Sequence, residues 1–508
     1  MNNNFLVCKN DENKFYIYDN TTGLILNVDK LFLKIMDKMI NSNFLNKESI
    51  YSKLDNDIIM KYNLEYYETF IRKYKELRVP FNDHYKKKIS KRSLKIHIET
   101  LGMKQLIFEM TRQCNLRCKY CIYSDHYWHH KKYENSTMEI RTAHRAVDIY
   151  MSIFFKIHKY NPKRRPVFTF YGGEPLLGFR NIKNIVEYIL SKYGEFKPIF
   201  NMTSNGTLLS DKVLKFISNI EDFYISVSLD GPREEHDRNR IMRDDSGSFD
   251  IIYQNLTKIR KMYPEIFPRV NLLACFDFKT NISRVAEFFE NDKNLPALMR
   301  VNIVEPLFTN YYRNFSKQDR DSFLRAYSEK QSEYIENAKL NRRPSRYIEL
   351  MFETSFLSVY NRFKFYHNNI FFEAFTGTCI PGDKLYVDTE GRFHICEKIN
   401  GNFPIGNIYE GLNLEKVSEI IEKYNIEVLS KCKKCVISRI CGSCYATFAA
   451  DKTFEIPEGF CESRIKSTKE TIKSLIEILI HNPKYFENKL LNVKKNSFNF
   501  NDSHCIYY

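Results

Sequence analysis

The sequence predicts an α/β chain built around a partial (β/α)6 barrel, preceded by a small strand-and-helix unit and followed by a cysteine-rich domain. Three observations support this prediction. Six short apolar runs alternate with longer helical patterns, three closely spaced cysteines follow the first run, and cysteines return at high density near the C-terminal end. A chain of 508 residues also exceeds what one hydrophobic core normally organises, so several domains are expected.

The N-terminal unit is expected to begin with three short strands separated by polar turns, at residues 5–8, 14–18 and 24–28. Apolar positions then follow helical spacing over residues 29–40 and 62–77, which predicts two helices. The basic stretch HYKKKISKRSLK marks the expected end of this unit.

The barrel strands are predicted from the six apolar runs at residues 106–110, 167–171, 198–203, 223–229, 270–276 and 298–304. Their alternation with helical patterns implies parallel strands joined by crossover helices, and six units rather than eight leave the barrel open. Ser136 and Glu139 have the spacing of a capping box, which predicts the start of the first crossover helix.

The remaining segments are expected to support the barrel. Residues 308–372 read as helical, aromatic and basic, which predicts a bridge packed on the barrel, and a helix over 466–480 is expected to close the fold. The predicted domain boundaries are 1–92 for the N-terminal unit, 93–306 for the barrel, 307–375 for the bridge, 376–480 for the cysteine-rich domain and 481–508 for an asparagine-rich tail.

Composition narrows the class of protein. The chain is 43% hydrophobic and 28% charged, its mean hydropathy is -0.46, and no apolar run approaches the ~20 residues of a spanning helix, so no membrane association is expected. The N-terminus lacks the pattern of a secretory signal, so we expect a cytoplasmic protein whose cysteines serve metals or catalysis. The formal charge of +16 is scattered along the chain, so no nucleic-acid partner is expected.

Cys114, Cys118 and Cys121 form a CxxxCxxC triad directly after the first barrel strand, where barrel enzymes place their chemistry. The same spacing would also place three cysteines on one face of a buried helix, but the intervening residues are polar. Thiolates on a short loop hold iron–sulfur clusters, which normally take four cysteines. Three ligands therefore predict a cluster with one open iron that can bind a small molecule.

The stretch TRQCNLRCKYC resembles the signature of the radical S-adenosylmethionine (radical SAM) superfamily. The resemblance implies a 4Fe-4S cluster whose open iron chelates the methionine part of S-adenosylmethionine, and cleavage of that cofactor to a 5′-deoxyadenosyl radical that abstracts hydrogen from a substrate. It also implies that the backbone of Tyr120 meets the adenine.

Loops after the later strands add candidate cofactor contacts, although each taken alone is ordinary turn chemistry. The GGEP turn after the second strand resembles the element that binds the methionine ammonium in this superfamily, and the loops after strands three and four resemble its ribose-side and cofactor-side loops. Asp230 could equally hydrogen-bond its own turn. The residues implied are Gly172, Gly173, Glu174, Pro175, Ser204, Asn205, Ser228, Asp230 and, suited to the cofactor carboxylate, Arg240.

Seven further cysteines lie near the C-terminal end, at positions 379, 396, 432, 435, 441, 444 and 461. Paired CxxC elements are typical of structural zinc sites, so zinc is one alternative. The arrangement, with Gly391 in its first loop, resembles the SPASM extension of radical enzymes that modify peptides and proteins. That resemblance implies two auxiliary iron–sulfur clusters of the 4Fe-4S type.

By the family pattern, one auxiliary cluster would be held by Cys432, Cys435, Cys441 and Cys461, and the other by Cys379, Cys396 and Cys444. The second set is one ligand short, and the last internal pair is CxxC where the family more often has CxxxC. Water, a substrate cysteine, or one of Cys8, Cys275 and Cys505 could supply the missing ligand. Otherwise these three leftover cysteines are expected to be buried as small hydrophobes.

The N-terminal unit resembles the winged-helix-like recognition element of enzymes that mature ribosomally made peptides, in which a leader peptide adds a strand to a sheet edge. The expected function is therefore a sactipeptide-type peptide maturase that forms thioethers in a precursor peptide with a leader, using a flavodoxin- or ferredoxin-type reductant. The alternatives are a carbon–carbon cross-linking maturase, an anaerobic sulfatase-maturing enzyme that forms formylglycine, and a non-catalytic iron–sulfur or zinc protein. The N-terminal unit could also be a docking domain without peptide contact.

Overall fold

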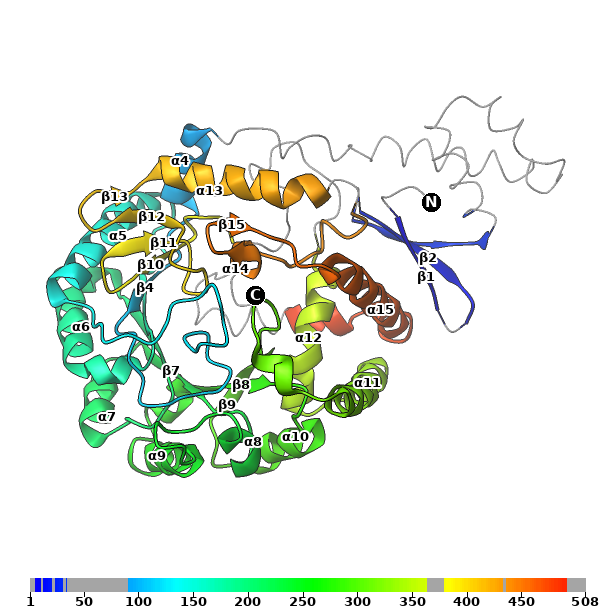
Figure 1. Cartoon of the computed structure of the whole chain (residues 1–508), viewed down its shortest axis with the longest axis horizontal. Helices are drawn as coiled ribbons and strands as arrows, with labels where there is room; N and C mark the ends of the chain where they lie inside the picture. The colour runs from blue at the N-terminus through cyan, green and yellow to red at the C-terminus, as the bar shows by residue number, and fades with distance from the viewer. Residues whose placement is uncertain are drawn as a thin grey trace.

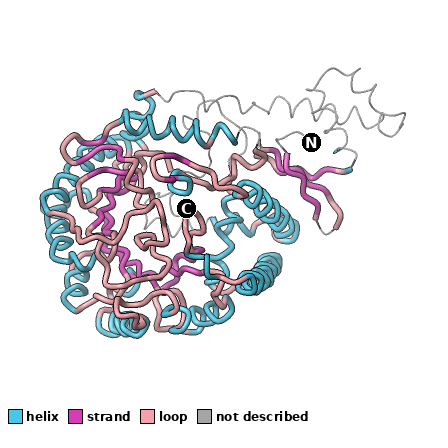
Figure 2. Tube along the Cα trace, in the orientation of Figure 1, coloured by secondary structure: helices cyan, strands magenta, loops and turns pink. Residues whose placement is uncertain are grey.

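The computed structural model describes residues 5–10, 12–20, 23–30, 33, 90–362, 379–432 and 435–490. Most of the described chain surrounds one curved ten-stranded sheet, with strand order β13-β12-β11-β10-β4-β5-β6-β7-β8-β9. Helices lie on the outer, convex side of this sheet, and loops fill the space on its inner side (Figures 1 and 2).

All six predicted barrel strands are confirmed. They run parallel and pair in sequence order, so each strand lies next to the one that follows it in the chain. Their bounds are β4 (Gln105–Glu109), β5 (Val167–Tyr171), β6 (Ile199–Ser204), β7 (Phe223–Ser228), β8 (Val270–Phe276) and β9 (Ala297–Ile303). Because parallel strands end at the same edge, the loops that follow them lie together.

Stacked phenylalanines hold the outer face of the sheet against the helices. Phe108, Phe170, Phe200 and Phe223 are fully buried, and neighbouring rings lie 5.6–6.1 Å apart in stacked pairs. Side chains alternate along a strand, so on each strand the residues next to these phenylalanines point into the barrel. The apolar period of the sequence thus decides which side chains are available to the site.

Each crossover helix returns the chain to the next parallel strand. The helices are α5 (Ile140–Tyr160), α6 (Phe179–Tyr193), α7 (Asp211–Ser218), α8 (Arg233–Asp237), α9 (Phe249–Met262) and α10 (Ile282–Asn291). The predicted capping box is wrong: α5 begins at Ile140 with Glu139 as its N-cap and has no side-chain cap. The carbonyl of Ser136 instead accepts hydrogen bonds from Thr111 Oγ1 and Arg112 N, so its segment pairs with the cysteine loop.

The predicted bridge is helical and partly covers the last barrel strand. Its helices are α11 (Lys317–Lys339) and α12 (Arg346–Tyr360), and α12 packs on β9 and α10. The expected closing helix begins earlier than predicted, because α15 runs over Phe460–His481, and it packs on α11 and α12. The predicted boundary at residue 92 falls inside α4 (Lys91–Thr100), which packs on α5 and α13 (Leu414–Glu427).

The cysteine-rich region continues the barrel sheet. Strand β10 (Lys384–Val387) pairs in parallel with β4, and β11 (Arg392–His394), β12 (Pro404–Asn407) and β13 (Gly411–Leu412) extend the sheet with antiparallel pairs. A short helix, α14 (Tyr445–Phe448), and the hairpin of β14 (Ala449–Ala450) and β15 (Thr453–Phe454) follow. The seam between the predicted domains is therefore a continuous hydrogen-bonded ladder.

A buried carboxylate, Glu109, joins the two sides of this seam. It is fully buried at the end of β4 and accepts hydrogen bonds from Tyr386 of β10 (2.6 Å), from Tyr123 (3.0 Å) and from Arg112 Nε (3.0 Å). Burial disfavours the charge, but Lys131 and Arg112 outweigh it and hold the pKa of Glu109 below its ordinary value. The network therefore stabilises an ionised carboxylate inside the molecule.

The three predicted N-terminal strands are also confirmed. They form an antiparallel sheet in the order β1 (Phe5–Lys9), β2 (Phe15–Asp19), β3 (Ile25–Val28), and β1 packs on α15 (Figure 1). The predicted helices over 29–40 and 62–77 lie almost wholly outside the described residues.

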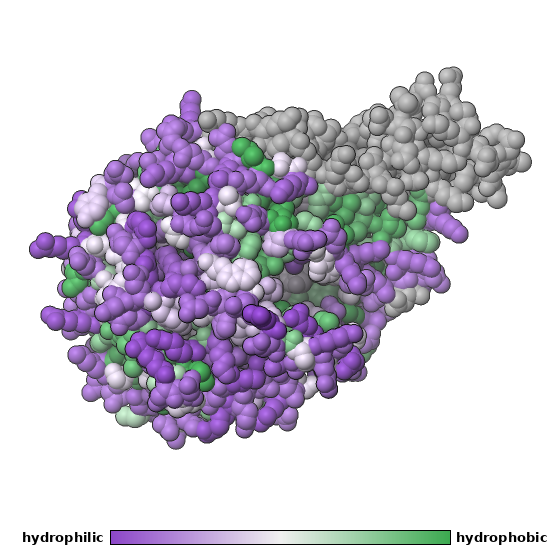
Figure 3. Space-filling model, in the orientation of Figure 1, coloured by the Kyte–Doolittle hydropathy of each residue, from purple (hydrophilic) through white to green (hydrophobic). Residues whose placement is uncertain are grey.

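The visible surface is largely hydrophilic, and apolar side chains gather near α15 and the N-terminal sheet (Figure 3). None of the helices in the described part of the chain combines the length and the apolar character that crossing a membrane requires.

Replacing Glu109 by glutamine tests the seam. The Glu109→Gln variant leaves Arg112 and Lys131 without their buried counter-charge, so we expect the free energy of unfolding to fall by about 3–5 kcal/mol. Glu134→Gln is the matched control, because Glu134 also pairs with Arg112 but is 58% exposed, and its loss should cost under about 1 kcal/mol. Urea unfolding followed by circular dichroism measures both; equal losses would contradict the role of Glu109.

Candidate active site

The predicted triad lies on the loop after β4, at the edge where the parallel strands end. Cys114 and Cys118 are 6% and 8% exposed, and they cluster with Leu116, Cys121 and Met242. Burial raises the pKa of Cys114 and of Cys118 to about 11. These sulfurs would therefore ionise only beside a positive charge such as a metal.

Two arginines and an asparagine hold the triad loop in place. Arg117 and Arg243 both donate to the carbonyl oxygen of Cys114, at 2.6–2.9 Å. Asn205 Nδ2, from the loop after β6, lies 2.9 Å from Asn115 Oδ1 and 3.8 Å from Cys114 Sγ. The role of Arg243 was missed from the sequence, because it follows a different strand and no motif marks it.

The GGEP turn binds the triad loop directly. The backbone N–H of Gly173 donates to Thr111 O (2.7 Å), and that of Glu174 donates to Gln113 O (2.8 Å). A Cβ on Gly172, whose φ is +133°, would clash with the carbonyl oxygen of Thr111. A Cβ on Gly173 would clash with the carbonyl oxygen of Gln113. The sequence predicted that these glycines let backbone approach a ligand, and the structure places the backbone of the triad loop there.

Glu174 connects the loops after β5 and β6 through its carboxylate. It is fully buried and accepts hydrogen bonds from Leu176 N (3.0 Å), Ser204 Oγ (2.9 Å) and Asn205 N (2.7 Å). Burial is the largest influence and raises its pKa to about 7 against the lowering effect of these bonds. A carboxylate has about four acceptor sites, so one remains for a further donor. Pro175 begins the short 3-10 helix that Glu174 caps.

Tyr120, Asp230 and Arg240 form a second buried group. The Tyr120 hydroxyl donates to Asp230 Oδ2 (2.5 Å), and Arg240 Nη1 donates to the same hydroxyl (2.9 Å). Asp230 Oδ1 accepts from Cys275 N (3.0 Å), so its side chain binds the neighbouring strand β8 rather than capping its own turn. Within the described part of the chain, buried Arg240 Nε has no hydrogen-bond partner, which suits an anionic ligand.

Two other strand-end residues lie on the inner side of the barrel. Ser228, at the end of β7, is half-buried and alternates with fully buried Val227. Cys275 in β8 is likewise half-buried between buried Ala274 and Phe276. As expected of a small hydrophobe, Cys275 packs against Tyr311 and Tyr312, and its backbone N–H donates to Asp230.

Four of the seven later cysteines converge. The pKa of Cys432 is raised to about 12, first by burial and then by the charges of Cys435, Cys441 and Cys461. At Cys435 burial again comes first, and Cys441 and Cys461 are among the charges that raise its pKa. The structure thus brings together the set that the family pattern assigned to one auxiliary cluster.

The other predicted set lies beside the barrel seam. Burial raises the pKa of Cys396 to about 12, and Cys444 is among the charges that act on it. Cys379 is half-buried and precedes the turn into β10. Among the described residues, no group of three or more His, Cys, Asp or Glu side chains is arranged to hold a metal ion.

The possible suppliers of a missing ligand are also placed. Cys8 is buried on β1, with its sulfur 3.9 Å from Lys469 O in α15, and Cys275 lies inside the barrel. Cys505 lies outside the described residues.

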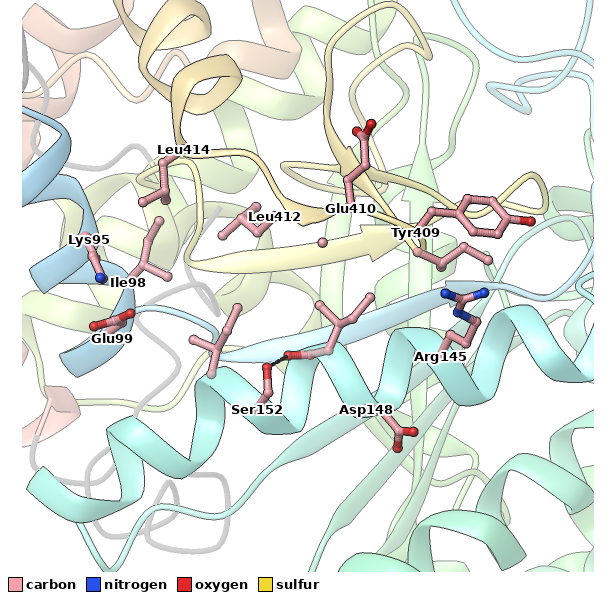
Figure 4. A pocket seen from close by; sticks show the side chains of 14 residues that line it. Lys95, Ile98, Glu99, Arg145, Asp148, Ser152, Tyr409, Glu410, Leu412 and Leu414 are labelled. Atoms are coloured by element: carbon pink, nitrogen blue, oxygen red, sulfur yellow. Dashed lines mark hydrogen bonds between the residues drawn. The ribbon is translucent and has the colours of Figure 1, made fainter.

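A cavity of about 500 Å³ lies elsewhere, between α4, α5 and the turn that joins β12 to β13 (Figure 4). Its lining includes Lys95, Glu99, Arg145 and exposed Tyr409, and none of the predicted site residues lines it. Its position on the helix side of the sheet separates it from the strand-end loops.

The profile of the radical SAM superfamily matches residues 108–273, which span the triad loop, the GGEP turn and strands β5 to β8. This match shows a radical SAM domain, and the chain is an enzyme. Its cofactors are a 4Fe-4S cluster and S-adenosylmethionine. Three thiols on one loop, two of them buried and one partly buried, and an unpartnered buried guanidinium nitrogen fit these two groups.

Several known proteins are similar to this chain. A cysteine-type anaerobic sulfatase-maturating enzyme of Clostridium perfringens (strain 13 / type A) is 25% identical over 353 residues, which are 67% of this chain and 88% of the relative. The radical SAM cyclopropyl synthase TigE of Paramaledivibacter caminithermalis is 23% identical over 61% of this chain and 64% of its own length. The solved structure "Native anSMEcpe with bound AdoMet and Cp18Cys peptide" has a TM-score of 0.51 at 20% identity, covering 78% of this chain and 99% of that one; it shares the fold.

The contact between the GGEP turn and the triad loop predicts a glycine requirement. Gly173→Ala should force the loop away from β5, so that about four irons per chain are lost on reconstitution. The matched control is Gly194→Ala, because a Cβ there meets no atom within 4 Å. Iron analysis and visible absorbance measure the outcome. Full iron content in Gly173→Ala would contradict the close packing described here.

Proposed function

We propose that this enzyme is a peptide maturase that abstracts hydrogen from a ribosomally made precursor peptide and forms thioether cross-links. The observation that supports it most is the environment of Tyr171, at the inner end of β5. Its pKa is raised first by burial and then by the charges of Glu397, Cys121 and Cys275. Charges of the triad and of the segment that follows Cys396 thus both act on Tyr171, and the proposal places the substrate between these two cysteine sites.

When bound, the cluster and S-adenosylmethionine supply a 5′-deoxyadenosyl radical. Cys114, Cys118 and Cys121 would hold the cluster. The free acceptor site on Glu174 suits the methionine ammonium, and Arg240 Nε suits the methionine carboxylate. Tyr120, Ser204, Asn205, Ser228 and Asp230, with the backbone of Gly172, Gly173 and Pro175, would shape the rest of the pocket.

The thioether assignment rests on the ligand sets of the two proposed auxiliary sites. Cys432, Cys435, Cys441 and Cys461 form a complete set of four ligands, whereas Cys379, Cys396 and Cys444 offer three. Cys8 is turned toward α15, and Cys275 lies beside Tyr120 and Asp230. A substrate cysteine suits the open position, and its sulfur would then be held near the carbon that loses hydrogen.

The N-terminal sheet supports a peptide substrate. Strands β1 and β3 are the outer strands of the described three-stranded sheet, and a leader peptide would add to such an edge through main-chain hydrogen bonds. We expect a flavodoxin- or ferredoxin-type reductant, and a cytoplasmic setting that keeps the cysteines reduced. A sulfatase-maturing activity that forms formylglycine is the second candidate, because the similar C. perfringens protein is named an anaerobic sulfatase-maturating enzyme. Carbon–carbon cross-linking remains the third.

A pair of cysteine variants tests this function. Anaerobically reconstituted protein with reductant should cleave S-adenosylmethionine to 5′-deoxyadenosine, and Cys118→Ala should not. Cys396→Ala should keep that cleavage but lose the peptide product, because only the auxiliary site is altered. Gly194→Ala, at a position where a Cβ meets no atom within 4 Å, is the control and should keep both activities.

A short cysteine-containing reading frame beside the gene would supply the substrate peptide for this test. Each thioether removes two hydrogens from the peptide, which mass spectrometry detects. A wild-type protein without 5′-deoxyadenosine formation would overturn the enzyme assignment. Conversion of a sulfatase peptide instead would favour formylglycine chemistry, and about twelve irons per chain separates three cubane clusters from zinc.

A further inference from the structure

The turn after β2 is hydrogen-bonded to the loop that carries Cys435. Asn20 Nδ2 donates to the carbonyl oxygen of Cys435 (3.1 Å) and to Ser438 Oγ (2.7 Å). In return, the backbone N–H of Arg439 donates to Asn20 Oδ1 (3.0 Å). One side chain thus binds three positions, Cys435, Ser438 and Arg439, of a loop that lies more than four hundred residues further along the chain.

These contacts use the whole hydrogen-bonding capacity of the asparagine. An amide side chain has two donor hydrogens and two acceptor sites, and the second acceptor site takes the Tyr18 hydroxyl (3.4 Å). Asn20, Ser438 and Arg439 are 4%, 2% and 6% exposed, so water cannot replace a lost partner without rearrangement. Such a fully satisfied buried amide specifies one geometry of the loop.

A second contact joins the same sheet to the same group of cysteines. Strand β1 packs on α15, and the Cys8 sulfur lies 3.9 Å from Lys469 O within that helix. Cys461 stands in the first turn of α15. Two of the four converging cysteines, Cys435 and Cys461, therefore belong to segments that the N-terminal sheet touches.

We propose that Asn20 is a positioning residue for the auxiliary cluster of Cys432, Cys435, Cys441 and Cys461, and that the N-terminal sheet is part of that cluster's site. This inference rests on the proposed function, which assigns a cluster to these cysteines. Because coupling between two sites is reciprocal, a peptide that binds the sheet also acts on the cluster, and the state of the cluster acts on peptide affinity.

The local hydrogen bonding gives the sign of the effect. The backbone N–H of Ile437 belongs to the segment that Asn20 binds and lies close enough to the Cys435 sulfur to donate a hydrogen bond to it. Hydrogen bonds to the sulfur ligands are one of the factors that set the reduction potential of an iron–sulfur cluster. Loosening the segment weakens this bond, so the midpoint potential of the cluster should become more negative.

Two asparagines of the sheet make a matched pair for the test. Asn20→Ala removes the hydrogen bonds to the Cys435 loop. Asn10→Ala removes a similarly buried asparagine whose side chain accepts a hydrogen bond from Lys14 N (2.8 Å) in the turn between β1 and β2. Both variants are reconstituted anaerobically as full chains. Iron content, circular dichroism and a redox titration followed by electron paramagnetic resonance are then compared with the wild type.

We expect Asn20→Ala to shift one auxiliary signal to a more negative potential or to lose about four irons per chain. The barrel cluster should keep its spectral response to S-adenosylmethionine, and Asn10→Ala should match the wild type. Asn20→Asp keeps the acceptor for Arg439 N but loses both donors and adds a negative charge, so its shift should have the same sign.

Two results would count against the inference, and they differ from failure of the proposed function. If Asn20→Ala keeps the wild-type iron content and potentials, the positioning role is wrong. If Asn10→Ala shows the same change as Asn20→Ala, the effect belongs to the stability of the sheet and the role is again wrong. A wild-type protein with only the barrel cluster would instead overturn the assignment of auxiliary clusters.

Discussion

The Glu109 carboxylate accepts hydrogen bonds from both sides of the junction between the barrel and the cysteine-rich region. Tyr123 and Arg112 come from the triad loop, and Tyr386 comes from β10. A buried charge is tolerated only when its partners surround it, so these groups have to be assembled together. The position of the triad loop and the pairing of β10 with β4 therefore depend on one another. The distance between the two cysteine sites depends on both.

Several residues recognised as candidate cofactor contacts also hold this chain together. Glu174 joins the loops after β5 and β6, Gly173 lies against the triad loop, and Asp230 spans from Tyr120 to Cys275. These hydrogen bonds fix the loops before any ligand is bound, which is the preorganisation that catalysis requires. Binding groups and scaffold are consequently the same side chains, and a substitution at one of them changes both properties.

The cysteine-rich region has two neighbours that differ in character. On the barrel side, Cys396 follows the strands that extend the sheet from β10. On the other side, Asn20 of the N-terminal sheet binds the Cys435 loop. The region thus contacts both the barrel sheet and the unit proposed to recognise the leader peptide.

What the sequence by itself determined is local. The six barrel strands, the three N-terminal strands and the cysteine spacings are encoded in short windows, because side-chain period and ligand spacing act between near neighbours. The pairing of β10 with β4, the carboxylate of Glu109, the inward position of Cys275 and the Asn20 contact were decided only by the tertiary structure. Each of them joins segments far apart in the chain, where no short pattern records which surfaces will meet, and the failed capping box at Ser136 shows such a long-range pairing overriding a local signal.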